Sequence, residues 1–221
     1  MTAPASPRIS RRKQLQQARS ASVVTAILQA ASQVLAEVGA QRFTTARVAE
    51  RAGVSVGSLY QYFPNKAAIL FQLQSDEWRD TTALLRGILE DHARPPRERL
   101  RAAVHAFVRS ECEEAAMRVA LGDAAPLYRD APEAEEPRAA GTRAIQAFLQ
   151  DAVPGLPEPS CRIAGDLIAM TLSAVGEAIS EKARSDARID IYTDELAEML
   201  VAYLAHLKTT GGTPDTVQRE A

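Results

Sequence analysis

Residues Thr44–Lys66 read TTARVAERAGVSVGSLYQYFPNK, and this stretch decides the fold. Thr44 and Ser55 each stand just before a short segment with helical apolar spacing, the position where a side-chain hydroxyl caps a helix. Gly53 ends the first segment, and Pro64 ends the second because the residue before a proline is disfavoured in helical geometry. The stretch therefore predicts helices at about 45–52 and 56–63, joined by a three-residue turn.

A longer helix braces the pair on each side. From Ser20 to Val38 the apolar residues follow one helical face, and Gly39 predicts the end of that helix. Asn65 is placed to cap a further helix that runs toward His92. This arrangement is a helix-turn-helix, which lays its second short helix in the major groove of DNA.

The residue types on the second short helix fit this use. Its first residues are small or hydroxylic, so they let the helix approach base edges: Ser55, Val56, Gly57 and Ser58. Hydroxyl and ammonium groups that can reach phosphate oxygens follow at Tyr60, Tyr62 and Lys66.

The whole stretch resembles the signature of the TetR/AcrR family: the second-helix pattern, the GlyValSer turn, the LeuTyr-x-TyrPhe block and the closing AsnLys. With the preceding helix, the resemblance covers about residues 20–70. It implies a homodimer that represses transcription from a palindromic operator on double-stranded DNA and is released by a small molecule bound in the C-terminal domain.

The resemblance also assigns roles within the helix-turn-helix. Phosphate contacts are implied for Thr44, Thr45, Ser58, Tyr60 and Lys66. Contacts with bases or the groove wall are implied for Ala46, Val56, Gly57, Gln61 and Tyr62, and we include Arg47 and Ser55 in the same predicted DNA surface. Ala46 and Val56 stand where relatives often have Arg, Lys or Gln, so thymine methyl contacts, water and DNA shape are expected to carry more of the specificity.

The remainder of the chain predicts helices at about 97–117, 118–122, 138–152, 160–184 and 192–208, separated by proline-bearing segments. With no alternating β-branched run, the fold class is all-α. The predicted domains are a basic arm with the helix-turn-helix over residues 1–66, a helical effector-binding and dimerisation domain over 67–208, and a disordered tail over 209–221.

Charge supports a polyanionic partner for the first domain. Residues 1–66 hold nine Lys/Arg and two acidic residues, a net charge of +7, whereas the rest of the chain holds 17 basic and 26 acidic residues, a net charge of −9. Such an asymmetry is typical of a chain that binds nucleic acid at one end. The Arg8–Lys13 segment is equally compatible with a minor-groove arm and with a solvated tail.

The helices predicted over 160–184 and 192–208 are expected to form a dimer interface. A surface helix needs only one apolar face, and the helix over 160–184 is apolar around more than one, so its second face can meet a partner subunit. The expected interface residues are Leu167, Leu172, Val175, Leu196, Leu200 and Tyr203. A fully buried helix of a monomer is the alternative reading.

An apolar effector pocket is expected beside the long helix that follows Asn65, which would act as a lever on the DNA-binding helices. Its predicted lining is Phe71, Trp78, His105, Phe107, Cys112, Met117, Met170 and Ser173.

Other functions find little support. His105 and Cys112 are two helical turns apart, about 10 Å, too far for a base and its nucleophile. The sequence shows no metal-ligand spacing, phosphate loop or cofactor motif, so neither an enzyme, a metal nor a cofactor is expected. With no signal peptide, no uninterrupted apolar span and two separated cysteines, a cytoplasmic protein without membrane contact is expected. The competing function is a helical small-molecule carrier that does not bind DNA specifically.

Overall fold

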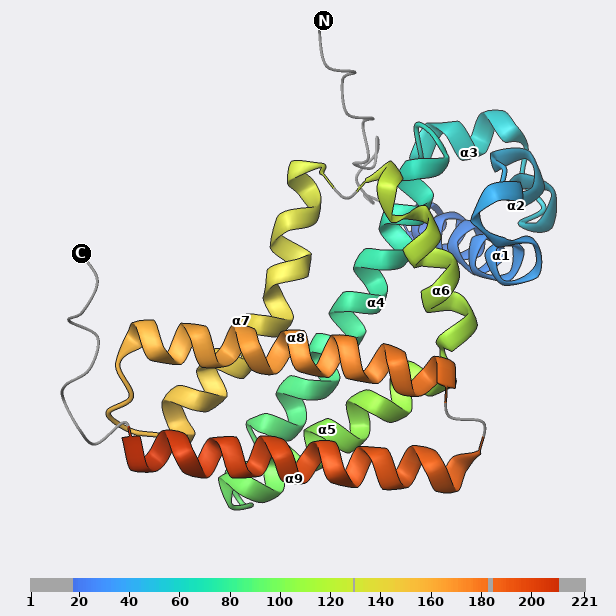
Figure 1. Cartoon of the computed structure of the whole chain (residues 1–221). Helices are drawn as coiled ribbons and strands as arrows, with labels where there is room; N and C mark the ends of the chain where they lie inside the picture. Colours follow the sequence, from blue (N-terminus) through green and yellow to red (C-terminus); the bar gives the residue numbers. More distant parts are fainter. Residues whose placement is uncertain (1–17, 129, 183–184, 211–221) are drawn as a thin grey trace, which may run out of the picture. The chain divides into compact units, whose positions relative to one another are not determined.

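The computed structural model describes residues 18–128, 130–182 and 185–210. Within these residues the secondary structure is helical and contains no strand, as the sequence predicts (Figure 1). The predicted arm before residue 18 and the predicted tail after residue 210 lie outside the described residues.

The chain divides into two compact units. Among the described residues, the N-terminal unit combines the chain up to Arg79 with the segment from Glu114 to Arg138, and the C-terminal unit combines Asp80–Glu113 with the described part of the chain from Ala139 onward. These units divide the chain differently from the predicted boundary at residue 66, because α4 (Lys66–Leu89) contributes to both.

The first four helices follow the predicted order: α1 (Ala18–Arg42), α2 (Thr45–Arg51), α3 (Val56–Tyr62) and α4. Gly39 leaves helical geometry with φ 70° and ψ 170°, but helix resumes beyond it as far as Arg42. The predicted end at Gly39 is therefore a kink rather than a stop.

Several of the later boundaries differ from the prediction. The helices predicted over 97–117 and 118–122 are α5 (Pro96–Glu113) and α6 (Ala115–Ala124), so the break between them comes earlier than predicted, at Glu114, which leaves helical geometry with φ −108° and ψ 14°. Two 3₁₀ turns, η1 (Ala125–Leu127) and η2 (Pro132–Ala134), replace the predicted loop.

The last three helices are α7 (Glu135–Ala152), α8 (Glu158–Lys182) and α9 (Asp186–Thr210), and all three begin earlier than predicted. Pro137 and Pro159 lie in the first turns of α7 and α8, where the missing N–H has no intrahelical partner to lose. Helix signals that treat every proline as a break therefore place these starts too late.

The N-terminal unit has a continuous apolar core. Ile27, Leu35, Phe43, Leu59 and Phe63 are fully buried there, so α1, α2 and α3 share one interior. Part of that core comes from far along the chain: Tyr128 packs on Phe71 with ring centroids 5.8 Å apart and donates a hydrogen bond to the carbonyl oxygen of Leu121. Burial of this ring also raises the pKa of the Tyr128 hydroxyl.

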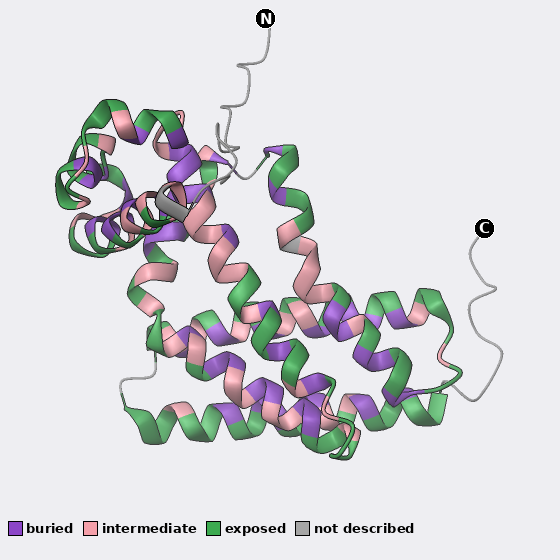
Figure 2. Cartoon of the chain, turned by 180° about the vertical axis from the view of Figure 1, so that it is seen from behind, coloured by how far each residue is buried: buried purple, intermediate pink, exposed green. Residues whose placement is uncertain are grey.

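The C-terminal unit is organised around α5, which packs against both α8 and α9. Gly176 of α8 permits a close approach to α5, since a Cβ at this position would lie 2.9 Å from a ring carbon of Phe107. Figure 2 shows buried and exposed faces alternating along the helices of this unit.

A buried charge fixes the end of this unit where α4, α5 and α7 meet. Arg99 is 3% exposed and donates hydrogen bonds to the carbonyl oxygen of Leu89 at 2.7 Å and to a carboxylate oxygen of Asp151 at 2.7 Å. Its guanidinium also lies 5.3 Å from the ring centroid of Phe148. Burying this charge is tolerable because it is paired and hydrogen-bonded.

Two of the described helices, Ser20–Arg42 and Glu158–Lys182, have the length and mean hydropathy of membrane spans. Core helices of proteins without membrane contact pass the same test. α1 buries Val24, Ile27, Ala31 and Leu35 in the N-terminal core, as a core helix does.

Candidate nucleic-acid interface

The turn between α2 and α3 is set by local hydrogen bonds. Gly53 has φ 66°, and its N–H donates to the carbonyl oxygen of Glu50, while the Val54 N–H donates to that of Ala49. These two bonds form a Schellman motif, which ends a helix with a left-handed residue. α3 therefore begins three residues later in a fixed direction.

Side-chain caps define where α2 and α3 begin, as predicted. Thr44 accepts a hydrogen bond from the Arg47 N–H at 3.3 Å, and Ser55 accepts one from the Ser58 N–H at 3.0 Å. Asn65 does the same for α4, accepting from the Ala68 N–H at 2.9 Å. Leu59, fully buried, holds α3 against the core.

The beginning of α3 is open to solvent. Ser55, Val56 and Gly57 are exposed, and the Val56 side chain is 40% exposed despite being apolar. Ala46 and Arg47 of α2 and Gln61 of α3 are exposed as well. A small, uncovered helix start is the form that fits into a major groove.

Hydroxyl groups from the two helices meet beside this surface. The Thr45 Oγ1 and Tyr60 Oη atoms lie 3.1 Å apart, and the Tyr60 side chain is 39% exposed. Ser58 and Lys66 are partly exposed. Each of these groups can donate a hydrogen bond to a phosphate oxygen.

Tyr62 corrects the predicted DNA surface. It is only 8% exposed and belongs to the core of the N-terminal unit, because it lies three residues after Leu59 on the same face of α3. Tyr62 is therefore a core residue and not a groove residue.

A bidentate ion pair, which the sequence did not reveal, joins α1 to α2. The two terminal nitrogens of Arg51 donate to the two carboxylate oxygens of Glu37 at 2.7 and 2.6 Å. The hydrogen bonds from Arg51 hold the pKa of the Glu37 carboxyl below its usual value. Because its guanidinium is already engaged, Arg51 braces the two helices rather than adding a free charge to the surface.

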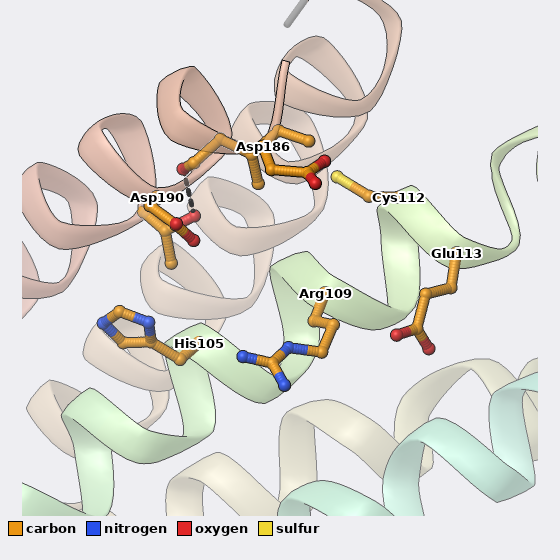
Figure 3. A pocket seen from close by; sticks show the side chains of 8 residues that line it. His105, Arg109, Cys112, Glu113, Asp186 and Asp190 are labelled. Atoms are coloured by element: carbon orange, nitrogen blue, oxygen red, sulfur yellow. Dashed lines mark hydrogen bonds between the residues drawn. The ribbon is translucent and has the colours of Figure 1, made fainter. Parts of the chain in front are cut away.

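The predicted effector residues are divided between the two compact units. Phe71, Trp78 and Met117 belong to the core of the N-terminal unit. The remaining five belong to the C-terminal unit and occupy separate surroundings there: His105 and Cys112 line a groove between α5 and α9 (Figure 3), Phe107 is buried toward α8, and Met170 and Ser173 are exposed.

Burial also corrects the predicted dimer interface. Leu172, Leu196 and Leu200 are 3–4% exposed and belong to the core of the C-terminal unit. Val175 and Tyr203 are partly buried, and Leu167 is 46% exposed. The outer apolar face of α8 is instead the stripe that we call the α8 stripe, Ile163, Leu167, Met170 and Ala174, whose spacing of four, three and four residues was readable in the sequence.

The described residues contain no group of three or more His, Cys, Asp or Glu side chains that could hold a metal ion. His105 is paired with Asp194 at 3.1 Å. Burial, and then the negative charges of Glu111, Asp186 and Glu113, raise the pKa of the Cys112 thiol, which opposes formation of a nucleophilic thiolate.

Two family models match the chain. The model described as bacterial regulatory proteins of the tetR family matches residues 27–73, and the one described as the tetracyclin repressor-like C-terminal domain matches residues 95–207. No curated protein matches the chain.

Solved structures share the fold at low sequence identity. A putative TetR-family regulator from Mesorhizobium loti aligns with TM-score 0.69 and 17% identity over 85% of this chain and 98% of that chain. FadR from Bacillus subtilis, in complex with stearoyl-CoA, aligns with TM-score 0.64 and 18% identity over 80% of this chain and 97% of that one. FadR of Bacillus halodurans, a fatty acid degradation regulator, aligns with TM-score 0.61 and 20% identity over 82% and 93%.

The matched C-terminal region spans more than half of the chain and the matched N-terminal region contains the helix-turn-helix, which decides against the alternative of a carrier that does not bind DNA and against an enzyme. The chain belongs to the TetR family of DNA-binding transcriptional regulators.

Proposed function

We propose that this regulator is a repressor that binds an inverted-repeat operator as a homodimer and dissociates when a small, largely apolar effector binds its C-terminal domain. The proposal that the protein binds DNA in this way rests on the exposed start of α3, which is flanked by the hydroxyl groups of Thr45 and Tyr60. The proposed DNA surface comprises Thr44, Thr45, Ala46, Arg47, Ser55, Val56, Gly57, Ser58, Tyr60, Gln61 and Lys66. Its place of action is the cytoplasm, where the DNA is.

The dimer proposal rests on the α8 stripe. Ile163 and Met170 are 68% and 65% exposed, and Leu167 lies between them on the same helical face. Large apolar side chains exposed in a row are typical of a helix that packs against a partner. Two copies related by a twofold axis would present two α3 helices to successive major grooves, which an inverted repeat matches.

Release by an effector is proposed to pass through α4. This single helix contributes residues 66–79 to the N-terminal unit and 80–89 to the C-terminal unit, so a displacement of the helix affects both. A tenfold loss of operator affinity requires a difference of only about 1.4 kcal/mol between the effector's affinities for the two conformations.

An apolar effector is consistent with what the fold accommodates in other proteins. FadR of Bacillus subtilis was solved with stearoyl-CoA, and RolR, of TM-score 0.54, was solved with resorcinol. In the present chain, Phe107 and its neighbours make the interior of the C-terminal unit apolar. Fluorescence of Trp78, the single tryptophan of the chain, gives a direct readout on α4.

The deciding experiment is selection of bound duplexes from a random DNA pool by the purified full-length protein. We expect an enriched inverted repeat whose half-site centres lie about one helical turn or more apart. Failure to enrich any motif, or enrichment of an unpaired half-site bound by a monomer, would overturn the proposed operator. Ligands that saturate Trp78 fluorescence without changing the affinity for that operator would contradict release through α4.

A further inference from the structure

The unit that carries the helix-turn-helix is completed by residues from much later in the chain. The chain leaves this unit after Arg79 and re-enters it at Glu114, and we call the described part of Glu114–Arg138 the returning segment. Its first helix, α6, packs against α1 (Figure 1). Leu121 and Ala124 of α6 are buried in the same core as the inner face of α1. The support of α1 therefore depends in part on where α6 lies.

An ion pair with little exposure to solvent joins the returning segment to α4. Arg118 Nη1 lies 2.5 Å from a carboxylate oxygen of Glu77, and the two side chains are 17% and 9% exposed. On the same turn of α4, the pair of Asp76 with Arg79 is open to solvent, with side chains 32% and 66% exposed. An exposed pair contributes little to stability, whereas removing one partner of a buried pair leaves an uncompensated charge and is strongly destabilising. The contact of Arg118 with Glu77 is therefore costly to break.

Hydrogen bonds extend this contact to the far end of α6. Gln74 donates from Nε2 to the second carboxylate oxygen of Glu77 at 2.7 Å. The Tyr128 hydroxyl, which follows α6, lies 3.3 Å from the side-chain oxygen of Gln74 and 3.1 Å from the carbonyl oxygen of Leu121. α6 is thus tied to α4 in its first turn by Arg118 and just beyond its last turn by Tyr128. A chain of polar groups with fixed partners specifies one register, which apolar packing alone does less strictly.

We propose that Arg118 and Glu77 are positioning residues for DNA binding. Their ion pair fixes the register of α6 against α4, and α6 in turn holds α1 in place against the helix-turn-helix. α1 passes this orientation to α2 through direct packing and through the bidentate pair of Glu37 with Arg51. Both positioning residues act through α1 and not by contact with the duplex.

The test replaces both charges at once in the full-length protein. Arg118→Met combined with Glu77→Leu removes the ion pair, and replacing a buried pair by apolar residues of similar volume is often neutral for stability. The midpoint of urea unfolding should therefore change little. Operator affinity, measured by fluorescence anisotropy on the selected duplex, should fall about tenfold, within the range that residues remote from a binding site can produce.

The matched control is Asp76→Asn combined with Arg79→Gln, which removes the neighbouring exposed pair and should bind the operator like the unmodified protein. Neither double variant changes the net charge, so a loss of overall positive charge does not explain a difference between them. Charge reversal, Glu77→Arg combined with Arg118→Glu, restores an ion pair between the two helices. It should recover part of the affinity, which a merely damaged core cannot do.

Hydrogen exchange without DNA separates this inference from the proposed repressor function. In the apolar double variant, amides of α1 and α6 should exchange about tenfold faster, while those of α9 in the C-terminal unit keep their rates. Unchanged exchange in α1, or undiminished operator affinity, overturns the inference. If the apolar variant loses stability, the charge-reversed variant decides, and an affinity no better than that of the apolar variant overturns the inference. If the unmodified protein selects no duplex, the proposed operator fails and exchange in α1 alone decides.

Discussion

The hydroxyl oxygens of Thr45 on α2 and Tyr60 on α3 lie 3.1 Å apart, so the two short helices of the DNA-binding motif share a hydrogen bond at their exposed edge. One hydroxyl donates to the other, and the second retains its hydrogen for an acceptor outside the protein. A phosphate oxygen is the acceptor that DNA offers there.

We therefore expect Tyr60→Phe to weaken binding to all duplexes by about the same factor, because a phosphate contact carries no base information. Thr45→Val should add little to Tyr60→Phe in the double variant, since each change breaks the same pair. Fluorescence anisotropy with operator and random duplexes measures both effects. A loss confined to the operator would show that Tyr60 contacts a base instead.

Lys66→Ala provides the electrostatic counterpart. Loss of one phosphate-neutralising charge should lower the slope of log affinity against log salt by about 1, whereas Tyr60→Phe should leave that slope unchanged. Arg51→Gln differs from both variants because it breaks the ion pair between Arg51 and Glu37, which joins α1 to α2, and does not remove a contact with phosphate. An equal fall in slope for Lys66→Ala and Tyr60→Phe would contradict the assignment of these roles.

Val56 should govern base preference. Its side chain is 40% exposed at the first turn of α3, where an apolar group can contact a thymine methyl. Val56→Lys should change the selected motif at one position in each half-site, since the ammonium donates to guanine acceptors. Recovery of an unchanged motif from this variant would contradict the placement of α3 in the groove.

Gly176 should be needed for packing of α8 on α5. In Gly176→Ala the new Cβ would meet a Phe107 ring carbon at 2.9 Å and the Glu111 Cγ at 3.1 Å. We expect a loss of about 1–3 kcal/mol in the free energy of unfolding, measured by urea denaturation. Gly87→Ala is the control, because nothing lies within 4 Å of its Cβ and alanine favours the helix by about 0.5–1 kcal/mol. Equal stabilities for the two variants would contradict the close approach.

The Arg99–Asp151 pair predicts a pH dependence of stability. The hydrogen bond from Arg99 holds the pKa of Asp151 below its usual value. Since the folded-state pKa is the lower one, the ionised carboxylate stabilises the fold above the unfolded pKa of about 3.9, and this contribution is lost as the pH falls through the folded-state value.

Asp151→Asn should therefore destabilise the protein at about pH 7, and the difference from the unmodified protein should shrink below about pH 4. Asp123→Asn, which removes an exposed carboxylate from α6, is the control. Urea unfolding across this range gives the comparison. A difference that stays constant down to about pH 3 would mean that Asp151 acts through its shape and not through its charge.

The sequence predicts most of the DNA-binding motif because its determinants are local. Thr44, Gly53, Ser55 and Asn65 each act on a backbone group a few residues away, and all four are where the pattern puts them. Tyr62 was misplaced because one helical turn decides between core and surface, and that choice depends on what packs against α3.

The starts of the later helices, and the choice of which face of each C-terminal helix is buried, were harder to predict from the sequence. Proline is a helix breaker in a sequence pattern, but Pro137 lies in the first turn of α7, which tolerates it. On α8 the apolar residues form two stripes, and sequence alone does not tell which one faces α5. Leu172 belongs to the buried stripe and Leu167 to the exposed one. The salt bridge of Arg51 with Glu37 and the α5–α9 groove join residues far apart in sequence, so no periodic signal marks them.

The two stripes of α8 give the sharpest test of assembly. Met170→Glu places a charge on a side chain that is 65% exposed, so the isolated chain should fold normally while a partner surface is disrupted. We expect this variant to sediment as a monomer and to bind the operator poorly. Val119→Glu, at another exposed apolar residue but on α6, should remain dimeric. Leu172→Glu should instead lose folded protein, because its side chain is 3% exposed in the core. Sedimentation velocity combined with circular dichroism separates these outcomes, and a dimeric Met170→Glu with undiminished operator affinity would refute the α8 stripe as the interface.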